Sequence, residues 1–169
     1  MDRNELERII REKLQEIMGT EKDDTFMVEA SGRHVHLTKE HVEALFGEGY
    51  ELTPVKDLSQ PGQFAAKERV RVIGPKGEFS NVAILGPCRN FSQVELSLTD
   101  CREIGVKGVI RESGKIEGTP GILIGVGDKY VHLDKGVIVA KRHIHMTRED
   151  AERFSVKDGE TVKVKIHSD

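Results

Sequence analysis

The chain has 169 residues, a net charge of −3, 37% hydrophobic residues and 33% charged residues. This length fits one domain or two small ones, and the low aromatic content of 5% predicts a core of Val, Ile and Leu. The net charge of −3 gives no reason to expect nucleic-acid binding through a broad basic surface. No apolar run is long enough to cross a membrane, and the charged N-terminus argues against secretion. Cys88 and Cys101 form neither a disulfide framework nor a zinc ribbon, so we expect reduced thiols in the cytoplasm.

Residues 3–18 have the pattern of an amphipathic helix, followed by a polar linker at 19–24. The apolar side chains lie on one stripe and comprise Leu6, Ile9, Ile10, Leu14, Ile17 and Met18. Two interpretations remain open. The helix packs on the body of the protein, or it is a detachable tail that binds a groove on a partner.

A six-residue motif occurs twice, as RHVHLT at 33–38 and as RHIHMT at 142–147. The paired histidines are His34 with His36 and His143 with His145. Alternate residues of a strand share one face, so each pair points two imidazoles together while Val35 or Ile144 faces a core. Imidazole pairs are good zinc ligands, and the repeat predicts a shared or paired metal site. The alternative is a surface strand that happens to carry two histidines.

Each motif ends in a threonine suited to cap a following helix, Thr38 in the first copy and Thr147 in the second. Short strands and turns account for most of the rest, at 25–37, 69–73, 79–85, 93–98, 136–140 and 161–166. This spacing favours a mainly β fold with short helices (α+β) and small closed sheets, and it disfavours a parallel α/β sheet.

Two side chains between the histidine pairs are candidates for chemistry. The Gly86-Pro87 turn is expected to expose Arg89, whose planar guanidinium suits phosphate or carboxylate. Glu95 lies in an alternating stretch and would complete a His-His-Glu zinc set. The alternatives are a surface ion pair for Arg89 and a solvent-facing strand residue for Glu95.

Several motifs together are similar to one known family, in order and from about Ser31 to Ile166. They are SGRHVHL at 31–37, LGPCR at 85–89, QVE at 93–95, GTPG at 118–121 and GVIVAKRHIHMT at 136–147. The chain resembles the PduL-type phosphate propanoyltransferases (phosphotransacylases). The resemblance implies an acyltransferase that moves an acyl group between coenzyme A and inorganic phosphate, giving an acyl phosphate such as propanoyl phosphate. It also implies two small β-barrels related by an internal repeat, capped by short helices, with two zinc ions between them.

The resemblance assigns roles to particular residues. His34, His36 and Glu95 would hold one zinc, and His143 and His145 would supply two ligands to the second. Arg89 would be the catalytic, phosphate-binding arginine, and the coenzyme A pocket would be lined by Ser31, Lys56 and Leu85. Ala83 stands where the family often has a basic residue, which weakens any assignment of the residues that bind the nucleotide end of coenzyme A. Cys88 is not expected to be a metal ligand.

The expected organisation is a helix and linker at 1–24, a first barrel half at 25–100 and a second, truncated half at 101–169. The family takes a third histidine for its second zinc from beyond this segment, and the surroundings of His167 do not match. We therefore expect an incomplete second barrel and zinc site, with low activity unless a second copy supplies strands. Residues 3–18 resemble extensions that bind shell proteins of bacterial microcompartments, so the expected setting is cytoplasmic, inside a microcompartment that serves propanediol degradation.

Two other functions remain open from the residues. A zinc hydrolase would use the same histidines and Glu95 to activate water, with no need of Arg89 beside the metal. A non-catalytic assembly module would use the metal only to link two half-domains. A Rossmann dehydrogenase is disfavoured, because no Gly-x-Gly-x-x-Gly stands between a strand and a helix.

Overall fold

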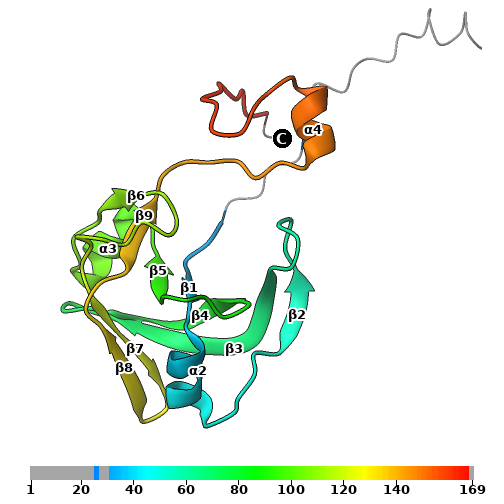
Figure 1. Cartoon of the computed structure of the whole chain (residues 1–169). Helices are drawn as coiled ribbons and strands as arrows, with labels where there is room; N and C mark the ends of the chain where they lie inside the picture. Colours follow the sequence, from blue (N-terminus) through cyan, green and yellow to red (C-terminus); the bar gives the residue numbers. More distant parts are fainter. Residues whose placement is uncertain (1–24, 27–30, 168–169) are drawn as a thin grey trace, which may run out of the picture. The chain divides into compact units, whose positions relative to one another are not determined.

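The computed structural model describes residues 25–26 and 31–167 and divides into two compact units (Figure 1). The larger is Ser31–Met146, and the smaller combines Met1–Ala30 with Thr147–Asp169. The predicted helix at 3–18 and its linker at 19–24 lie outside the described residues. The described part is mainly β with three short helices, so the predicted mixture of strands and short helices is confirmed.

The larger unit is built on one mixed sheet of nine strands, which curls around its core (Figure 1). The strands are β1 (His34–His36), β2 (Pro54–Asp57), β3 (Phe64–Ile73), β4 (Glu78–Gly86), β5 (Gln93–Glu95), β6 (Ile110–Arg111), β7 (Ile122–Val126), β8 (Lys129–Leu133) and β9 (Val137–Ala140). Their order is β6-β9-β5-β1-β4-β3-β7-β8, with β2 paired to β3. The short strand β1 therefore lies inside the sheet, parallel to β4 on one side and antiparallel to β5 on the other.

The long hairpin of β3 and β4 follows from the alternation seen in the sequence. Val70 and Val72 of β3 and Val82 and Ile84 of β4 are buried in the core, at most 2% exposed. The turn between the strands is closed by the Gly74 amide, which donates to the Gly77 carbonyl at 2.9 Å. Hydrophobic burial on one face and a tight Gly-containing turn thus fix the pairing of these two strands.

Helix α2 (Lys39–Phe46) begins where the sequence predicts, with Thr38 as its N-cap accepting from the His41 amide at 3.1 Å. Val42 and Leu45 form its buried face, and Phe46 packs partly against the core. This prediction is confirmed.

Helix α3 (Leu98–Ile104) replaces the end of a predicted strand. The extended stretch expected through residue 98 is wrong beyond Glu95, because Ser97 starts a helix. Its hydroxyl accepts from the Asp100 amide while the Asp100 carboxylate accepts from the Ser97 amide, which makes a capping box. The Ser-x-x-Asp spacing was present in the sequence and outweighs the apolar alternation around it.

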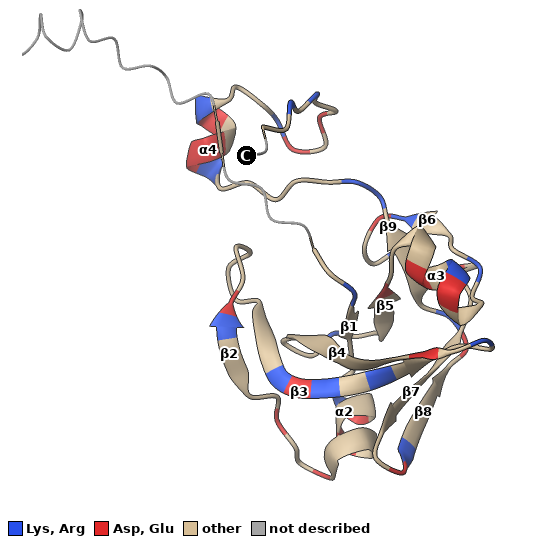
Figure 2. Ribbon diagram, turned by 180° about the vertical axis from the view of Figure 1, so that it is seen from behind, with Lys and Arg blue, Asp and Glu red and all other residues tan. Residues whose placement is uncertain are grey.

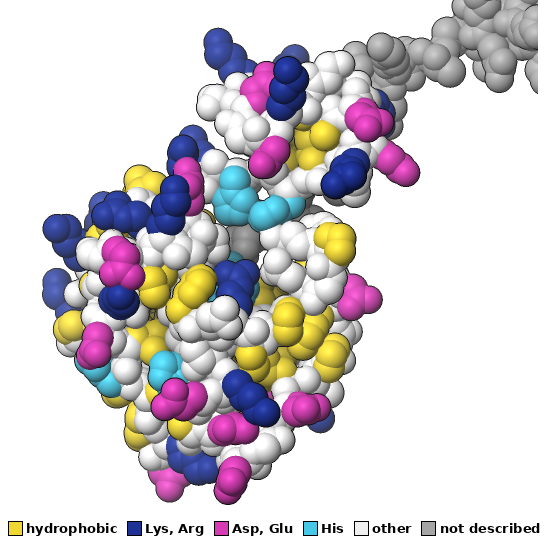
Figure 3. Space-filling view, viewed as in Figure 1, with side chains coloured by type: hydrophobic (Ala, Val, Ile, Leu, Met, Phe, Trp, Pro, Cys, Tyr) yellow, Lys and Arg dark blue, Asp and Glu magenta, His cyan; other side chains and the backbone are white. Residues whose placement is uncertain are grey.

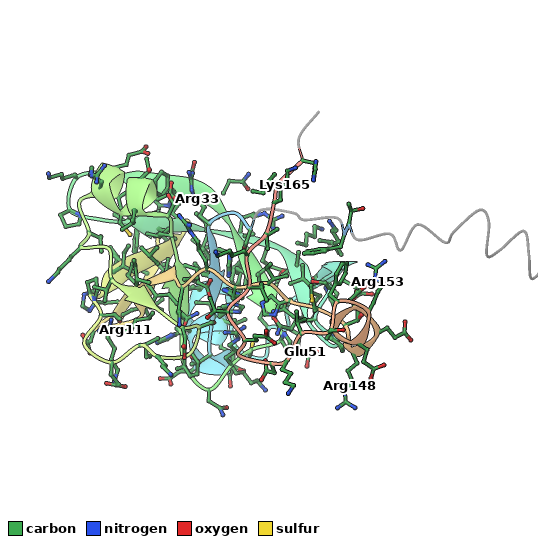
Figure 4. All side chains as sticks on the ribbon, turned by 90° about the horizontal axis from the view of Figure 1, so that it is seen from above. Arg33, Glu51, Arg111, Arg148, Arg153 and Lys165 are labelled. Carbon is green, nitrogen blue, oxygen red and sulfur yellow. The ribbon has the colours of Figure 1, made fainter. Side chains whose placement is uncertain are left out.

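Arg33, the first residue of the first motif (labelled in Figure 4), links β1 to α3 through an ion pair. Its guanidinium donates to Asp100 at 2.8 Å and lies over the Phe79 ring at 3.9 Å. Burial acts to raise the pKa of Asp100, but the Ser97 amide and then the Arg33 guanidinium favour the carboxylate, and the pKa is lowered. The residue before His34 is thereby fixed on the sheet.

Three strand predictions are wrong. The first strand was predicted at 25–37, but among the described residues of that range it covers only His34–His36. Only these three residues pair with β4 or β5. Strand β9 ends at Ala140, so the second motif is not in a regular strand, and Ile144 is 39% exposed rather than buried. Residues 161–166 form no strand in the described chain, and their apolar side chains Val162, Val164 and Ile166 are exposed. Alternation without a paired neighbour does not make a strand.

In the smaller unit, α4 (Arg148–Arg153) begins at the predicted cap, Thr147, whose hydroxyl accepts from the Asp150 amide at 3.1 Å. The Phe26 and Phe154 rings meet edge to face with centroids 5.2 Å apart. Arg153 lies over the Phe154 ring at 4.5 Å. The helix that follows the second motif is therefore confirmed.

Basic side chains recur along β3, where Lys67, Arg69 and Arg71 alternate with other residues (Figure 2). Over the face seen in Figure 3, acidic, basic and apolar side chains are interspersed. Among the helices of the described residues, none has the length and apolar character needed to span a bilayer.

Candidate metal centre

The first histidine pair lies side by side on β1, inside the sheet. The His34 and His36 rings meet edge to face with centroids 5.1 Å apart, and both residues are buried, at 7% and 2% exposed. Val35 between them is fully buried on the opposite side. The alternation predicted for a His-x-His strand is thus present in this copy.

Each of these rings has its Nδ1 engaged by a backbone carbonyl. His34 Nδ1 donates to the Gly32 carbonyl at 2.9 Å, and His36 Nδ1 donates to the Leu85 carbonyl at 3.2 Å. A carbonyl only accepts, so both rings carry a proton on Nδ1, and Nε2 is the nitrogen of each ring left available to a metal. Such outer hydrogen bonds are typical of histidines that bind a metal through Nε2.

Glu95 completes a three-residue donor set. It is the cross-strand partner of His34 on β5, with its Oε2 3.6 Å from His34 Nε2. One ligand atom from each of His34, His36 and Glu95 lies within 4.8 Å of the other two. Two imidazole nitrogens and one carboxylate oxygen are a donor set that zinc accepts with an open position, so these residues fit the metal expected here.

The electrostatics keep this donor set ready to bind a cation. Burial, assisted by the charge of Arg89 and the neighbouring His34, lowers the pKa of His36 to about 4. Burial acts to raise the pKa of Glu95, but the interaction with His34 and the hydroxyl of Ser113 outweigh it and lower that pKa to about 2. Near neutral pH, His36 is therefore a neutral ligand and Glu95 an anionic one, the forms in which both bind metals.

Arg89 lies on the loop that follows the cis Gly86-Pro87 peptide, and its charge interacts with that of Glu95. It is half-buried, and one of its terminal nitrogens donates to the Ser113 hydroxyl at 3.3 Å. Burial lowers the pKa of its guanidinium and Glu95 opposes this, yet an arginine remains a cation at neutral pH. A fixed cation thus adjoins the His-His-Glu cluster, an arrangement suited to an oxyanion.

Ser113 and Gln93 hold the carboxylate in place. Glu95 Oε1 accepts from the Ser113 hydroxyl at 3.0 Å and from the Gln93 side-chain amide at 2.7 Å. Gln93 in turn accepts from the Gly114 amide at 2.8 Å. Gln93 stands in the strand pattern on the same side as Glu95, but Ser113 has no sequence signal, because it reaches the site from a loop 18 residues later.

The second pair lies on the segment after β9. The His143 and His145 rings have centroids 4.7 Å apart, and His143 Nδ1 donates to the Lys141 carbonyl at 2.6 Å. His145 Nε2 lies 2.8 Å from the side-chain nitrogen of Gln60. Burial and the neighbouring His143 lower the pKa of His145, and Glu95 opposes this. In the described part of the chain, this pair does not meet a third His, Cys, Asp or Glu at ligand spacing.

The family model for phosphate propanoyltransferase matches residues 27–169. The chain belongs to the phosphate propanoyltransferase family. It is therefore an enzyme of the acyltransferase class. A phosphate propanoyltransferase of Leptotrichia buccalis is 92% identical over 169 residues, covering 100% of this chain and 80% of the relative. Phosphate propanoyltransferases of Sebaldella termitidis and Clostridioides difficile are 74% and 56% identical, over 99% and 95% of this chain and 79% and 78% of those relatives.

The residues that the family resemblance assigned to coenzyme A are spread over two strands and the segment before β1. Ser31 is exposed just before β1, and Lys56 is exposed on β2. Leu85 on β4 contributes the carbonyl that holds His36. Ala83, two residues earlier, pairs directly with His34. In this family member the coenzyme A assignments thus remain predictions, while Leu85 has a structural link to the His-His-Glu cluster.

Cys88 is exposed in the turn before Arg89 and forms no disulfide. Burial of its sulfur raises the pKa of the thiol, so it is protonated at neutral pH and is a poor nucleophile there. Cys101 is buried in α3, where burial likewise raises its pKa.

Proposed function

We propose that this acyltransferase moves a short acyl group, such as propanoyl, between coenzyme A and inorganic phosphate. The site would comprise one zinc held by His34, His36 and Glu95, and a second zinc with two ligands from His143 and His145. The observation that carries the proposal is the buried His-His-Glu cluster with Arg89 joined to its carboxylate through Ser113. Membership of the family supplies the substrates, which the relatives' name gives as phosphate and propanoyl.

In the forward reaction, a phosphate oxygen forms a bond to the thioester carbonyl carbon and the carbon–sulfur bond breaks, releasing the thiolate of coenzyme A and the acyl phosphate. Arg89 is the group that binds phosphate, because its planar guanidinium offers paired N–H donors and a charge that does not titrate. Glu95, anionic at neutral pH, holds that cation near the cluster by charge attraction. Zinc, when bound, supplies Lewis-acid stabilisation of oxyanion and thiolate charge.

Coenzyme A would lie along Ser31, Lys56 and Leu85. Lys56 supports this, because an exposed ammonium on β2 suits the phosphates of the nucleotide. The proposal predicts that Lys56→Ala raises KM for the acyl-coenzyme A and leaves KM for phosphate unchanged. Arg89→Ala should instead raise KM for phosphate and leave KM for the acyl-coenzyme A unchanged.

For the chain as a whole we retain the family's architecture as a proposal, with barrel halves at 25–100 and 101–169 related by the histidine motif. We also propose that residues 3–18 bind a microcompartment shell protein, placing the enzyme in a compartment for propanediol degradation. Deleting residues 1–20 tests the tail: retained zinc content and melting temperature with lost co-sedimentation with shells support it, and loss of folding contradicts it.

The reaction is tested with the zinc-loaded full chain and propanoyl-coenzyme A, with and without phosphate. We expect free coenzyme A only when phosphate is present, with one acyl phosphate formed for each coenzyme A. Release of coenzyme A without phosphate would favour the zinc hydrolase. A parent chain that folds and keeps zinc but releases no coenzyme A, with or without phosphate, would favour the assembly module, whereas an Arg89→Ala variant that folds, keeps zinc and loses the parent's activity favours the enzyme.

A further inference from the structure

We propose that Ser92, held by His41, is the positioning residue that fixes Arg89 and Glu95 relative to the histidine strand. This inference rests on the proposed function and deepens it. Neither residue belongs to a motif for metal or phosphate binding, and the hydrogen bonds of Ser92 to Thr38 and His41 connect the pair to the backbone segments that carry the site.

The loop that carries Arg89 runs from the end of β4 to the start of β5, at residues 87–92. The Arg89 amide donates to the Leu37 carbonyl at 2.9 Å, so the loop lies against the residue that follows the His-x-His strand. One backbone bond fixes the loop at a single point. A second fixed point is needed to set the direction in which the Arg89 side chain leaves the loop.

Ser92 provides that second point. It is 6% exposed, and its hydroxyl accepts from the Thr38 amide at 3.0 Å. The same hydroxyl lies 2.7 Å from Nδ1 of His41 on α2. The Ser92 carbonyl closely faces Gly136, where an added Cβ would lie 2.7 Å from it. The residue is therefore held by its side chain on one side and closely packed through its backbone on the other.

Ser92 lies midway in sequence between Arg89 and Glu95 and is bonded to Thr38, two residues after His36. Its hydroxyl thus joins the segments that carry the oxyanion-binding cation, the carboxylate and one imidazole. His41 is itself fixed, since its amide donates to the Thr38 hydroxyl at 3.1 Å. A shift of about 1 Å in a group that positions substrate lowers activity by up to about 100-fold.

The test compares Ser92→Ala, Ser92→Thr and His41→Ala with the parent chain at saturating zinc. His132→Ala is the matched control, because that histidine is exposed on β8 and pairs only with the exposed Asp134 among the described residues. Zinc per chain, kcat, KM for phosphate and KM for propanoyl-coenzyme A are measured for each. Amide hydrogen exchange over residues 87–92 is measured on the same samples without substrate.

For Ser92→Ala we expect kcat/KM for phosphate to fall by about 10- to 100-fold with KM for propanoyl-coenzyme A unchanged. Exchange over 87–92 should become faster, and Ser92→Thr, which keeps the hydroxyl, should restore most of both properties. His41→Ala should give the same pattern at smaller size, and it serves as the decisive variant if Ser92→Ala does not fold. The control should match the parent.

Parent-like kinetics and exchange in both Ser92→Ala and His41→Ala would overturn the inference while leaving the proposed function intact. Equal losses for both substrates without rescue by threonine would also overturn it, because they indicate a general structural role. If the parent itself transfers no acyl group to phosphate, the proposed function fails, and unchanged exchange over 87–92 in the variants would separately reject the positioning role.

Discussion

Replacing His36 with glutamine should reduce the loss of stability of the metal-free protein between pH 7 and pH 5. His36 has a pKa lowered from 6.5 to about 4 in the folded chain, chiefly by burial and then by the charges of Arg89 and His34. The unfolded chain binds this proton more tightly, so protonation favours unfolding. Stability that depends on His36 is therefore present above about pH 6.5, falls as the pH drops from 6.5 to 4, and changes no further below that.

The size of the effect follows from the two pKa values. At pH 5, the difference between a pKa of 6.5 and one of about 4 lowers the free energy of unfolding by about 2 kcal/mol relative to pH 7. A glutamine does not titrate, so His36→Gln should lose about 2 kcal/mol less than the parent between these pH values. The stability of the variant at pH 5 is compared with that of the same variant at pH 7, because the substitution also changes the hydrogen bond to the Leu85 carbonyl.

The assay is urea denaturation followed by circular dichroism at pH 7 and pH 5, after removal of metal with a chelator. His132→Gln is the control, because this histidine is exposed, and it should show the parent's loss of stability. Equal losses in the parent and in His36→Gln would refute the reasoning, since His36 would then titrate alike in the folded and unfolded chains.

Three further predictions concern the site and the strands that support it. Arg89→Ala should lower kcat/KM for phosphate by about 100-fold or more with zinc content unchanged, and Arg89→Lys should recover only part of this activity because lysine lacks the planar fork. Steady-state kinetics and metal analysis test this prediction, and parent-like kinetics in Arg89→Ala would contradict it. Glu95→Gln should weaken zinc binding by at least about tenfold in a competition titration with a chromogenic chelator, and an unchanged affinity would remove Glu95 from the ligand set. Gly121→Ala should cost about 1–3 kcal/mol in chemical denaturation, because its Cβ would collide with the Leu133 carbonyl, whereas Gly77→Ala, in open space, should change stability by less than about 0.5 kcal/mol; equal stability of the two would contradict the tight packing at Gly121.

The geometry of the first histidine motif was predictable because it is local. A His-x-His in a strand places both rings on one face whatever the rest of the chain does, and Val35 between them is buried as expected. Glu95 was a sound candidate for a similar reason, since the strand alternation put it on the same side as Gln93.

Other features depended on contacts that no local pattern encodes. The second motif has nearly the same residues, yet it follows β9 without a sheet neighbour, and Ile144 is exposed where Val35 is buried. Ser113 and Ser92 reach the site through loops, so their roles emerge only when segments far apart in sequence are brought together. At residue 97 the capping box is visible in the sequence, and it determines the local structure over the apolar alternation around it.

The most direct test of a zinc centre built on His34, His36 and Glu95 is the zinc content per chain of the parent and of the double variant His34→Ala/His36→Ala. The matched comparison is His143→Ala/His145→Ala, in which the second motif is removed instead. The first double variant should lose the zinc that the second retains at this cluster. Equal zinc content in the parent and in His34→Ala/His36→Ala would contradict the assignment.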